Sequence, residues 1–177
     1  MLFRSVRWLG GLDVLVYAAG VMPTVAEDEY DAGKDREVME VNVVGAMAWL
    51  DEGARVFAAA GAGTLVGIGS VAGERGRMGN PAYCASKAAL HAFLESLRNR
   101  LDRVGVVVLT VKPGPVRTPM VDGRGPLPLM IEAEDAAAQI AAAILAGRRT
   151  VYVPWLWGPI MAVIRAIPSI VFRRLRV

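Results

Sequence analysis

The feature that most constrains the fold of this chain is a regular alternation between short apolar runs and longer segments with helical periodicity. The apolar runs are rich in β-branched residues and close on small or turn-forming residues; they lie at 13–17, 61–70, 104–114 and 149–154. Such runs are typical of strands that are buried on both faces of a parallel sheet. The segments between them repeat apolar residues at helical spacing and lie at about 38–57, 81–103 and 132–147. This order predicts an α/β fold, an open and mostly parallel sheet with flanking helices and right-handed crossovers.

The composition fits one globular domain and argues against several classes of partner. With 177 residues, 54% of them apolar, the chain is long enough for one domain with a large core. The net charge of +3 is mild, and the basic residues of the first 135 positions are dispersed, so no nucleic acid partner is expected. Cys84 is the single cysteine, and no Cys/His cluster has metal-ligand spacing, so we expect neither a disulfide nor a metal site. We expect a reducing, cytoplasmic location, because Arg4, Arg7 and Asp13 interrupt the apolar start and argue against a secretion signal.

Small and polar residues follow the predicted strands, at the edge where a parallel sheet binds its ligands. These residues are Ala19, Gly20, Ser70, Pro113, Gly114 and, a few positions later, Thr118. The predicted helix over 81–103 begins in the loop after Ser70 and carries Tyr83 and Lys87. Because positions i and i+4 share one face of a helix, these two side chains project into the same space. The sequence therefore predicts that Ser70, Tyr83 and Lys87 converge.

These three residue types suit proton transfer to or from an alcohol or carbonyl oxygen. A phenol has a pKa of about 10, and a nearby ammonium such as that of Lys87 favours the phenolate. Ser70 would donate a hydrogen bond that holds a substrate oxygen within reach of the Tyr83 phenol. Asn42, inside the first predicted helix, has both a donor and an acceptor, and it would hold a water that passes protons toward Lys87.

Five motifs in this order resemble the short-chain dehydrogenase/reductase (SDR) family. They are AAG at 18–20, VNVVG at 41–45, GS at 69–70, YCASK at 83–87 and PGPVRT at 113–118. The resemblance implies a partial Rossmann-like, doubly wound parallel sheet. It also implies an oxidoreductase that uses NAD or NADP to interconvert an alcohol and a carbonyl by hydride transfer. The implied substrate is a small-molecule alcohol or ketone.

The resemblance also assigns roles to individual residues. Asn42, Ser70, Tyr83 and Lys87 match the catalytic tetrad of the family. In that tetrad Tyr83 would be the acid/base, Ser70 would orient the substrate, and Lys87 would also contact the nicotinamide ribose. The implied cofactor-binding residues are Ala19, Gly20, Tyr83, Lys87, Pro113, Gly114, Val116 and Thr118. His91, one turn beyond Lys87, is given no role.

Two departures from the family pattern bear on function. Tyr17 and Ala18 stand where the family usually carries asparagines. No strand followed by a glycine-rich turn precedes residue 13, although the family binds the cofactor pyrophosphate at such a turn. We therefore expect residues 1–154 to form a truncated Rossmann-like domain whose unpaired first edge causes homo-oligomerisation. The alternative function is a non-catalytic SDR remnant or binding module that has lost cofactor binding.

Residues 155–177 are expected to form an apolar, arginine-rich helical tail. A bilayer-spanning helix needs about 20 uninterrupted apolar residues, and Pro159, Arg165 and Pro168 interrupt this segment. Its tryptophans and terminal arginines fit a segment that lies in a membrane interface, as a peripheral contact. The tail resembles those of SDR members that meet lipidic substrates. A substrate-lid helix or a subunit contact is the alternative, and the sequence leaves both open.

Overall fold

A computed structural model describes residues 10–123, 125 and 127–175, so residues 1–9 of the predicted domain and 176–177 of the predicted tail lie outside the described residues. The strands are β1 (Val14–Tyr17), β2 (Gly63–Ile68), β3 (Val106–Pro113), β4 (Val116–Arg117), β5 (Ile131–Glu132) and β6 (Thr150–Val153). The α-helices are α2 (Ala32–Met39), α3 (Ala46–Ala60), α4 (Pro81–Leu101), α5 (Ala133–Leu145), α6 (Trp157–Ala166) and α7 (Ser169–Phe172). A π-helix, η1 (Glu40–Gly45), joins α2 to α3, and 3₁₀ turns form η2 (Val71–Glu74), η3 (Asp102–Val104) and η4 (Pro119–Val121).

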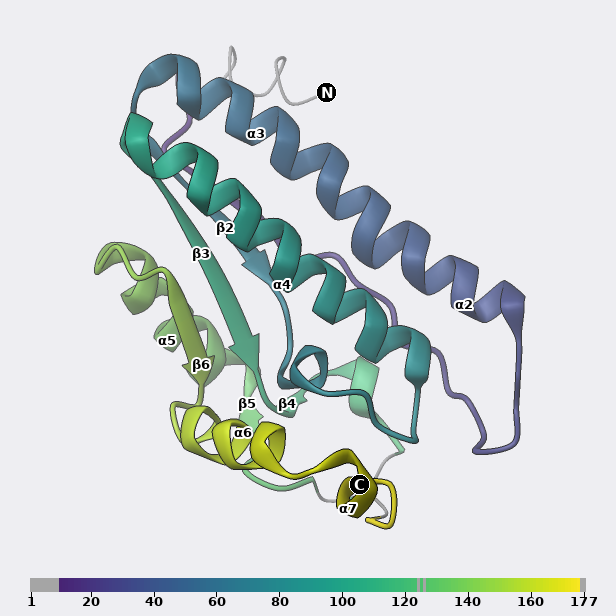
Figure 1. The fold of residues 1–177 in the computed structure, drawn as a ribbon. Coiled ribbons are helices and arrows are strands. Elements are labelled where there is room, and N and C mark those ends of the chain that lie inside the picture. The colour runs from purple at the N-terminus through teal and green to yellow at the C-terminus, as the bar shows by residue number, and fades with distance from the viewer. Residues whose placement is uncertain (1–9, 124, 126, 176–177) are drawn as a thin grey trace.

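The main sheet consists of parallel strands in the order β1-β2-β3-β6 (Figure 1). The predicted α/β fold with a Rossmann-like, doubly wound parallel sheet is therefore confirmed. Strands β4 and β5 form a separate parallel pair beyond the end of β3. Within the described part of the chain, β1 pairs with β2 alone, so it is an edge strand. The carboxyl ends of all four main strands lie at one end of the molecule, and the loops that follow them meet there.

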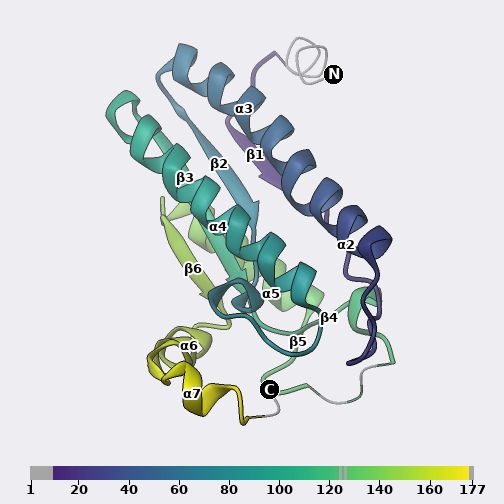
Figure 2. The same cartoon turned by 45° about the vertical axis from the view of Figure 1, so that its right-hand side comes forward.

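Two helices cover one face of the sheet and a third covers the other (Figure 1 and Figure 2). Leu65 and Val66 are neighbours in β2, so their side chains point to opposite faces. Leu65 packs in a cluster with residues of α3 and α4, including Leu50, Phe57, Leu90 and Leu94. Val66 packs in a second cluster, which holds Leu109, Val111 and, from α5, Ala136 and Ala143. Burial of both faces explains why these strands read as almost continuous apolar runs.

The crossovers do not all have the same hand. The strands stand in chain order across the sheet, so each crossover steps in the same direction. Helices α3 and α4 pass over one face, whereas α5 passes over the opposite face. The crossover through α5 therefore has the opposite hand to the other two, and the prediction of uniformly right-handed crossovers is wrong. The physical reason is burial: α5 covers an apolar face that α3 and α4 leave open.

Helices α6 and α7 lie beyond the carboxyl ends of the strands (Figure 1). Trp157 and Met161 attach α6 to the body of the protein, where they are buried in a cluster with Val71. None of the helices in the described segments is both long enough and apolar enough to cross a bilayer.

Candidate active site

The start of α4 is fixed by Asn80, which sequence reasoning did not single out. Asn80 is the N-cap of the helix, and its Oδ1 accepts a hydrogen bond from the Tyr83 N–H at 3.2 Å. Its Nδ2 donates to the Pro23 carbonyl at 2.7 Å, in the segment that follows β1. Asn80 has a φ of 63°, a left-handed conformation that asparagine tolerates better than most residues. This cap ties the helix that carries Tyr83 to the segment that leaves the first strand.

Lys87 lies one helical turn after Tyr83 and is almost completely buried, with 4% of its surface exposed. Its Nζ donates a hydrogen bond to the Ile68 carbonyl, the last residue of β2, at 2.9 Å. The same Nζ lies 5.6 Å from the centre of the Tyr83 ring. Burial lowers the pKa of Lys87 to about 8. The structure thus brings the predicted Tyr83–Lys87 pair together at the carboxyl end of β2.

Asn42 is fully buried in the π-helix, where it holds the segment after β1. Its Oδ1 accepts from the Val21 N–H at 2.8 Å, and its Nδ2 donates to the Val21 carbonyl at 3.0 Å. The second Nδ2 hydrogen goes to Ser86 Oγ at 3.1 Å, so both side-chain donors of Asn42 are used. A π-helical turn inside an α-helix is frequent at functional sites. Asn42 therefore holds backbone in place, and only acceptor capacity on its Oδ1 is left for a water.

Gly20 lies against both Asn42 and Lys87. A Cβ at this position would lie 3.3 Å from Asn42 Oδ1 and 3.5 Å from Lys87 Nζ. Because Gly20 has no side chain, the backbone that follows β1 can lie close to the buried ammonium of Lys87. Ala19, the preceding residue, is exposed.

Ser70 follows β2 and contacts His91, which the sequence analysis left without a role. The Ser70 N–H donates to His91 Nε2 at 3.4 Å, and Ser70 Oγ accepts from the Ala72 N–H at 3.1 Å. Burial and the nearby ammonium of Lys112 lower the pKa of His91 to about 4. His91 is neutral above that pH and acts as a hydrogen-bond acceptor. The signal in the sequence was its position four residues after Lys87, on the same face of α4.

The remaining predicted cofactor residues follow β3. Pro113 ends that strand and pairs with Val153 of β6. The Gly114 N–H donates to the Val153 carbonyl at 2.9 Å, and a Cβ on Gly114 would lie 1.9 Å from Trp157 Nε1. Val116 belongs to β4 and packs against the second core cluster. Thr118 Oγ1 donates to the Val116 carbonyl at 3.4 Å.

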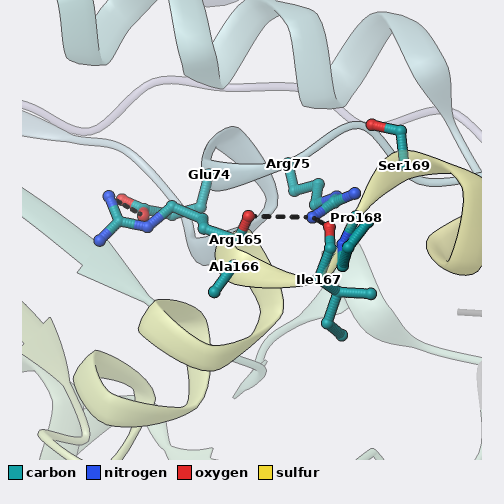
Figure 3. Close-up of a pocket in the computed structure, with 7 residues that line it drawn as sticks. All are labelled: Glu74, Arg75, Arg165, Ala166, Ile167, Pro168 and Ser169. Atoms are coloured by element: carbon teal, nitrogen blue, oxygen red, sulfur yellow. Dashed lines mark hydrogen bonds and ion pairs between the residues drawn. The ribbon is translucent and has the colours of Figure 1, made fainter.

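Two open cavities lie in the loops beyond the strand ends. One, of about 610 Å³, is lined by Arg117 of β4 and by residues of the loop after Thr118, which are Val121, Asp122, Gly123, Gly125, Leu127, Leu129 and Met130. The other, of about 520 Å³, lies between the end of η2 and the segment that joins α6 to α7 (Figure 3).

Glu74, at the second cavity, is a buried carboxylate with several partners. It forms ion pairs with Lys112 and, at 3.2 Å, with Arg165 Nη1, and it accepts from the Tyr152 hydroxyl at 3.2 Å. Burial raises the pKa of Glu74, but the Lys112 and Arg165 charges outweigh burial and hold that pKa below its usual value. Glu74 thereby joins the segment after Ser70 to β3, β6 and α6. Sequence reasoning missed this cluster because its members are far apart in the chain.

The chain is similar in sequence to known proteins of one family. A family model described as short chain dehydrogenase matches residues 2–126. An uncharacterized oxidoreductase of Mycobacterium tuberculosis is 34% identical over 166 residues, which cover 94% of this chain and 67% of that protein. An uncharacterized oxidoreductase of Myxococcus xanthus is 36% identical over 172 residues, which cover 94% of this chain and 68% of that protein.

Solved structures share the fold. A short chain dehydrogenase from Burkholderia cenocepacia in complex with NADP has a TM-score of 0.84 at 24% identity, covering 98% of this chain and 75% of that one. A short-chain dehydrogenase from Sphingobium yanoikuyae in complex with NADPH has a TM-score of 0.74 at 21% identity. The match covers 89% of this chain and 66% of that one.

Proposed function

Because the chain belongs to the short-chain dehydrogenase family, we propose that it is an NAD(P)-dependent oxidoreductase that interconverts an alcohol and a carbonyl compound. The observation that carries this proposal is the environment of Lys87. Its ammonium is buried, and among the described residues Ile68 alone accepts one of its three N–H groups. A buried charge without a full set of partners is costly unless a ligand supplies them.

The residues around Lys87 fit the nicotinamide half of the cofactor. Gly20 leaves the backbone open beside the ammonium, and the hydroxyls of a ribose are the kind of acceptor that the free N–H groups need. Two groups of residues would hold this half of the cofactor from opposite sides. The first consists of Ala19, Gly20, Tyr83 and Lys87, and the second of Pro113, Gly114, Val116 and Thr118. NAD(P), when bound, supplies the site that gives or takes the hydride.

The protein would contribute the proton transfer. Tyr83 would give its phenolic proton to the carbonyl oxygen during reduction, or take a proton from the alcohol during oxidation. The positive charge of Lys87 would stabilise the phenolate that forms. Ser70 would hold the substrate oxygen, because its Oγ accepts from the Ala72 N–H and its own hydrogen can still be donated. His91 would be a positioning residue that fixes the Ser70 backbone.

The proposed substrate is a small alcohol or ketone with an apolar, lipid-like portion. The apolar portion would lie against Val121, Leu127, Leu129 and Met130 in the cavity beyond Thr118, and the polar end would lie toward Arg117 and Asp122, which also line it. A reducing cytoplasm suits the buried free thiol of Cys84. We also propose that the chain is a homo-oligomer, because β1 is an edge strand with exposed valines.

A second function is favoured by one observation. In the printed sequence, no apolar run followed by a glycine-rich motif precedes residue 13, and the family binds the pyrophosphate at such a turn. Tested by itself, these 177 residues would then act as a binding module or a non-catalytic remnant that keeps the site around Lys87.

The two proposals are separated by titrating the full chain with NADPH and then NADH, followed by its tryptophan fluorescence, and by assaying ketone reduction. We expect saturable binding, and we expect Tyr83→Phe to keep that binding while lowering turnover by roughly 10²–10⁴-fold, the usual contribution of a general acid. Tyr30→Phe, at a tyrosine that is 95% exposed, is the matched control. Binding without turnover in the unmodified chain would favour the binding module, and absence of binding would contradict the proposed enzyme.

A further inference from the structure

The face of α6 opposite Trp157 and Met161 carries no polar side chain, and Arg165, the one charged residue of the helix, pairs with Glu74. Trp157 and Met161 point into the body of the protein and are buried. The opposite face of the helix consists of Pro159, Ala162, Val163 and Ala166, all exposed. Val163 in particular has 66% of its surface exposed. A helix that faces water normally carries polar residues on its outer side, so an outer face that is wholly apolar indicates a partner.

The apolar surface continues on both sides of this helix. Trp155, just before α6, is 70% exposed, and Leu156 is 38% exposed. In and beside α7, Ile170, Val171 and Leu175 are 60%, 47% and 43% exposed. We call the exposed apolar residues between Trp155 and Leu175 the tail surface.

The charge around the tail surface has one sign. From Trp155 onward the sequence contains four arginines and no aspartate or glutamate. Arg173 and Arg174, which follow α7, are exposed. In the part of the chain that the structure describes, neither of them forms an ion pair with an acid. These two charges are therefore available to an anionic partner.

The tail surface is held in place by the segment that follows Ser70. The Nη1 of Arg75 donates to the carbonyls of Arg165 and Ile167, at 3.1 and 2.6 Å (Figure 3). It also donates to the Ile164 carbonyl at 2.7 Å. The Arg75 guanidinium also lies 4.0 Å from the centre of the Phe172 ring in α7. These contacts order α6 and α7 in water, so a partner would meet a preformed surface.

We propose that the tail surface binds the interface of an anionic lipid bilayer. Exposed aliphatic residues, a tryptophan at the edge and adjacent arginines are the combination that such an interface binds, through apolar burial and attraction to acidic headgroups. A second copy of the chain is a poorer occupant. It would bring a second set of arginines toward the first, with no acid from this segment to pair with them. Binding would place the carboxyl ends of the strands, and the loops that follow them, next to the lipid.

Flotation of the full chain with vesicles tests this proposal without any enzyme assay. We expect binding to vesicles of phosphatidylcholine with phosphatidylglycerol, weaker binding to phosphatidylcholine alone, and loss of the difference at high salt. The double variant Val163→Asp, Ile170→Asp should bind roughly tenfold or more weakly, because both changes put charge into the apolar face. Arg173→Gln and Arg174→Gln should each weaken binding roughly fivefold, the effect of one basic residue at such a surface. Leu145→Asp, at a leucine of α5 that is 89% exposed, should bind like the unmodified chain.

Several results would overturn the proposal. One is failure of the unmodified chain to float with anionic vesicles. Another is equal binding by the double variant, provided that its thermal unfolding matches that of the unmodified chain. A concentration-dependent dimer in light scattering that the double variant abolishes, without any lipid binding, would assign the tail surface to a second copy.

Discussion

At the scale of single residues, the buried imidazole of His91 makes the region around Ser70 sensitive to acid. Its pKa is lowered from 6.5 to about 4 in the folded protein, so between these values the unfolded chain binds more protons than the folded one. The stability that depends on neutral His91 is therefore lost as the pH falls from about 6.5 to about 4. The loss should reach at most roughly 3 kcal/mol, from 1.36 kcal/mol per pKa unit.

His91→Gln tests this prediction, since glutamine offers an amide oxygen that does not titrate. Urea unfolding at a series of pH values should show a shallower loss of stability in His91→Gln than in the unmodified chain over this window. The carboxylates titrate equally in both proteins, so their contribution cancels when the two unfolding free energies are subtracted at each pH. If the free energy of unfolding fell equally with pH in both proteins, His91 would not be the group that makes this region sensitive to acid.

Gly45 and Tyr17 form a second testable contact at this scale. The Tyr17 hydroxyl donates to the Val41 carbonyl at 2.6 Å, and a Cβ on Gly45 would lie 2.8 Å from that hydroxyl. Gly45→Ala alone should destabilise the protein by about 1–3 kcal/mol, the usual cost of overpacking. In the Tyr17→Phe background the same change should be neutral or stabilising, because the clash is gone and alanine favours a helix over glycine by about 1 kcal/mol.

A double-mutant cycle by chemical denaturation measures this coupling. Tyr17→Phe alone should cost about 1 kcal/mol, the value of one hydrogen bond. Strict additivity of the two changes would show that the hydroxyl and Gly45 do not meet.

At the scale of elements, the position of α6 and α7 depends on Arg75 of the loop after η2. Arg75→Ala removes three hydrogen bonds to carbonyls near the end of α6 and the stacking on Phe172. Arg75→Lys should also be damaging, because an ammonium has no planar group to stack on the Phe172 ring. We expect both variants to raise amide hydrogen exchange over residues 160–172, by roughly 10-fold or more, and to leave α3 protected.

The matched control is Arg55→Ala, at an exposed arginine of α3 that pairs with Glu52. It should leave exchange in α6 and α7 unchanged, since an exposed pair of this kind contributes at most about 1 kcal/mol. Equal exchange in Arg75→Ala and the unmodified chain would mean that Trp157 and Met161 hold the segment without help.

At the scale of the whole molecule, the edge of β1 is exposed. Its far edge has no strand partner in the described residues, and Val14 and Val16 are 38% and 47% exposed. The register pairs Val16 with Val66, so Val16 faces the side of the sheet that α5 covers further along. An apolar edge strand of this kind promotes association. We therefore expect the chain to oligomerise through β1.

Val16→Lys should raise the dissociation constant of this oligomer by roughly tenfold, because a charge on an edge strand opposes pairing. Val104→Lys is a control of similar exposure, at 41%, in the distant η3 turn. Size-exclusion chromatography with light scattering, run at several concentrations, measures the molar mass of both variants and hence the dissociation of the oligomer. A stable monomer of the unmodified chain across the accessible concentrations would refute the prediction.

The sequence by itself determined the secondary structure and where a site would form. β-branched runs and helical spacing are local patterns, and they fixed β1, β2, β3 and β6 together with their connecting helices. Because parallel strands end at one edge, the sequence also predicted that Ser70 and the Tyr83–Lys87 pair lie at the same end of the sheet, and the structure brings Lys87 to the last residue of β2.

Only the tertiary structure decided how these elements are held and which residues support them. The contact of His91 with Ser70, the amide of Asn42 on Val21 and the ion pair of Glu74 with Arg165 join residues 21 or more positions apart. The opposite hand of the crossover through α5 likewise follows from which apolar face was left to cover. The physical reason is that local periodicity specifies which surface of an element is apolar. The choice of the distant partner that buries this surface depends on the packing of the whole chain.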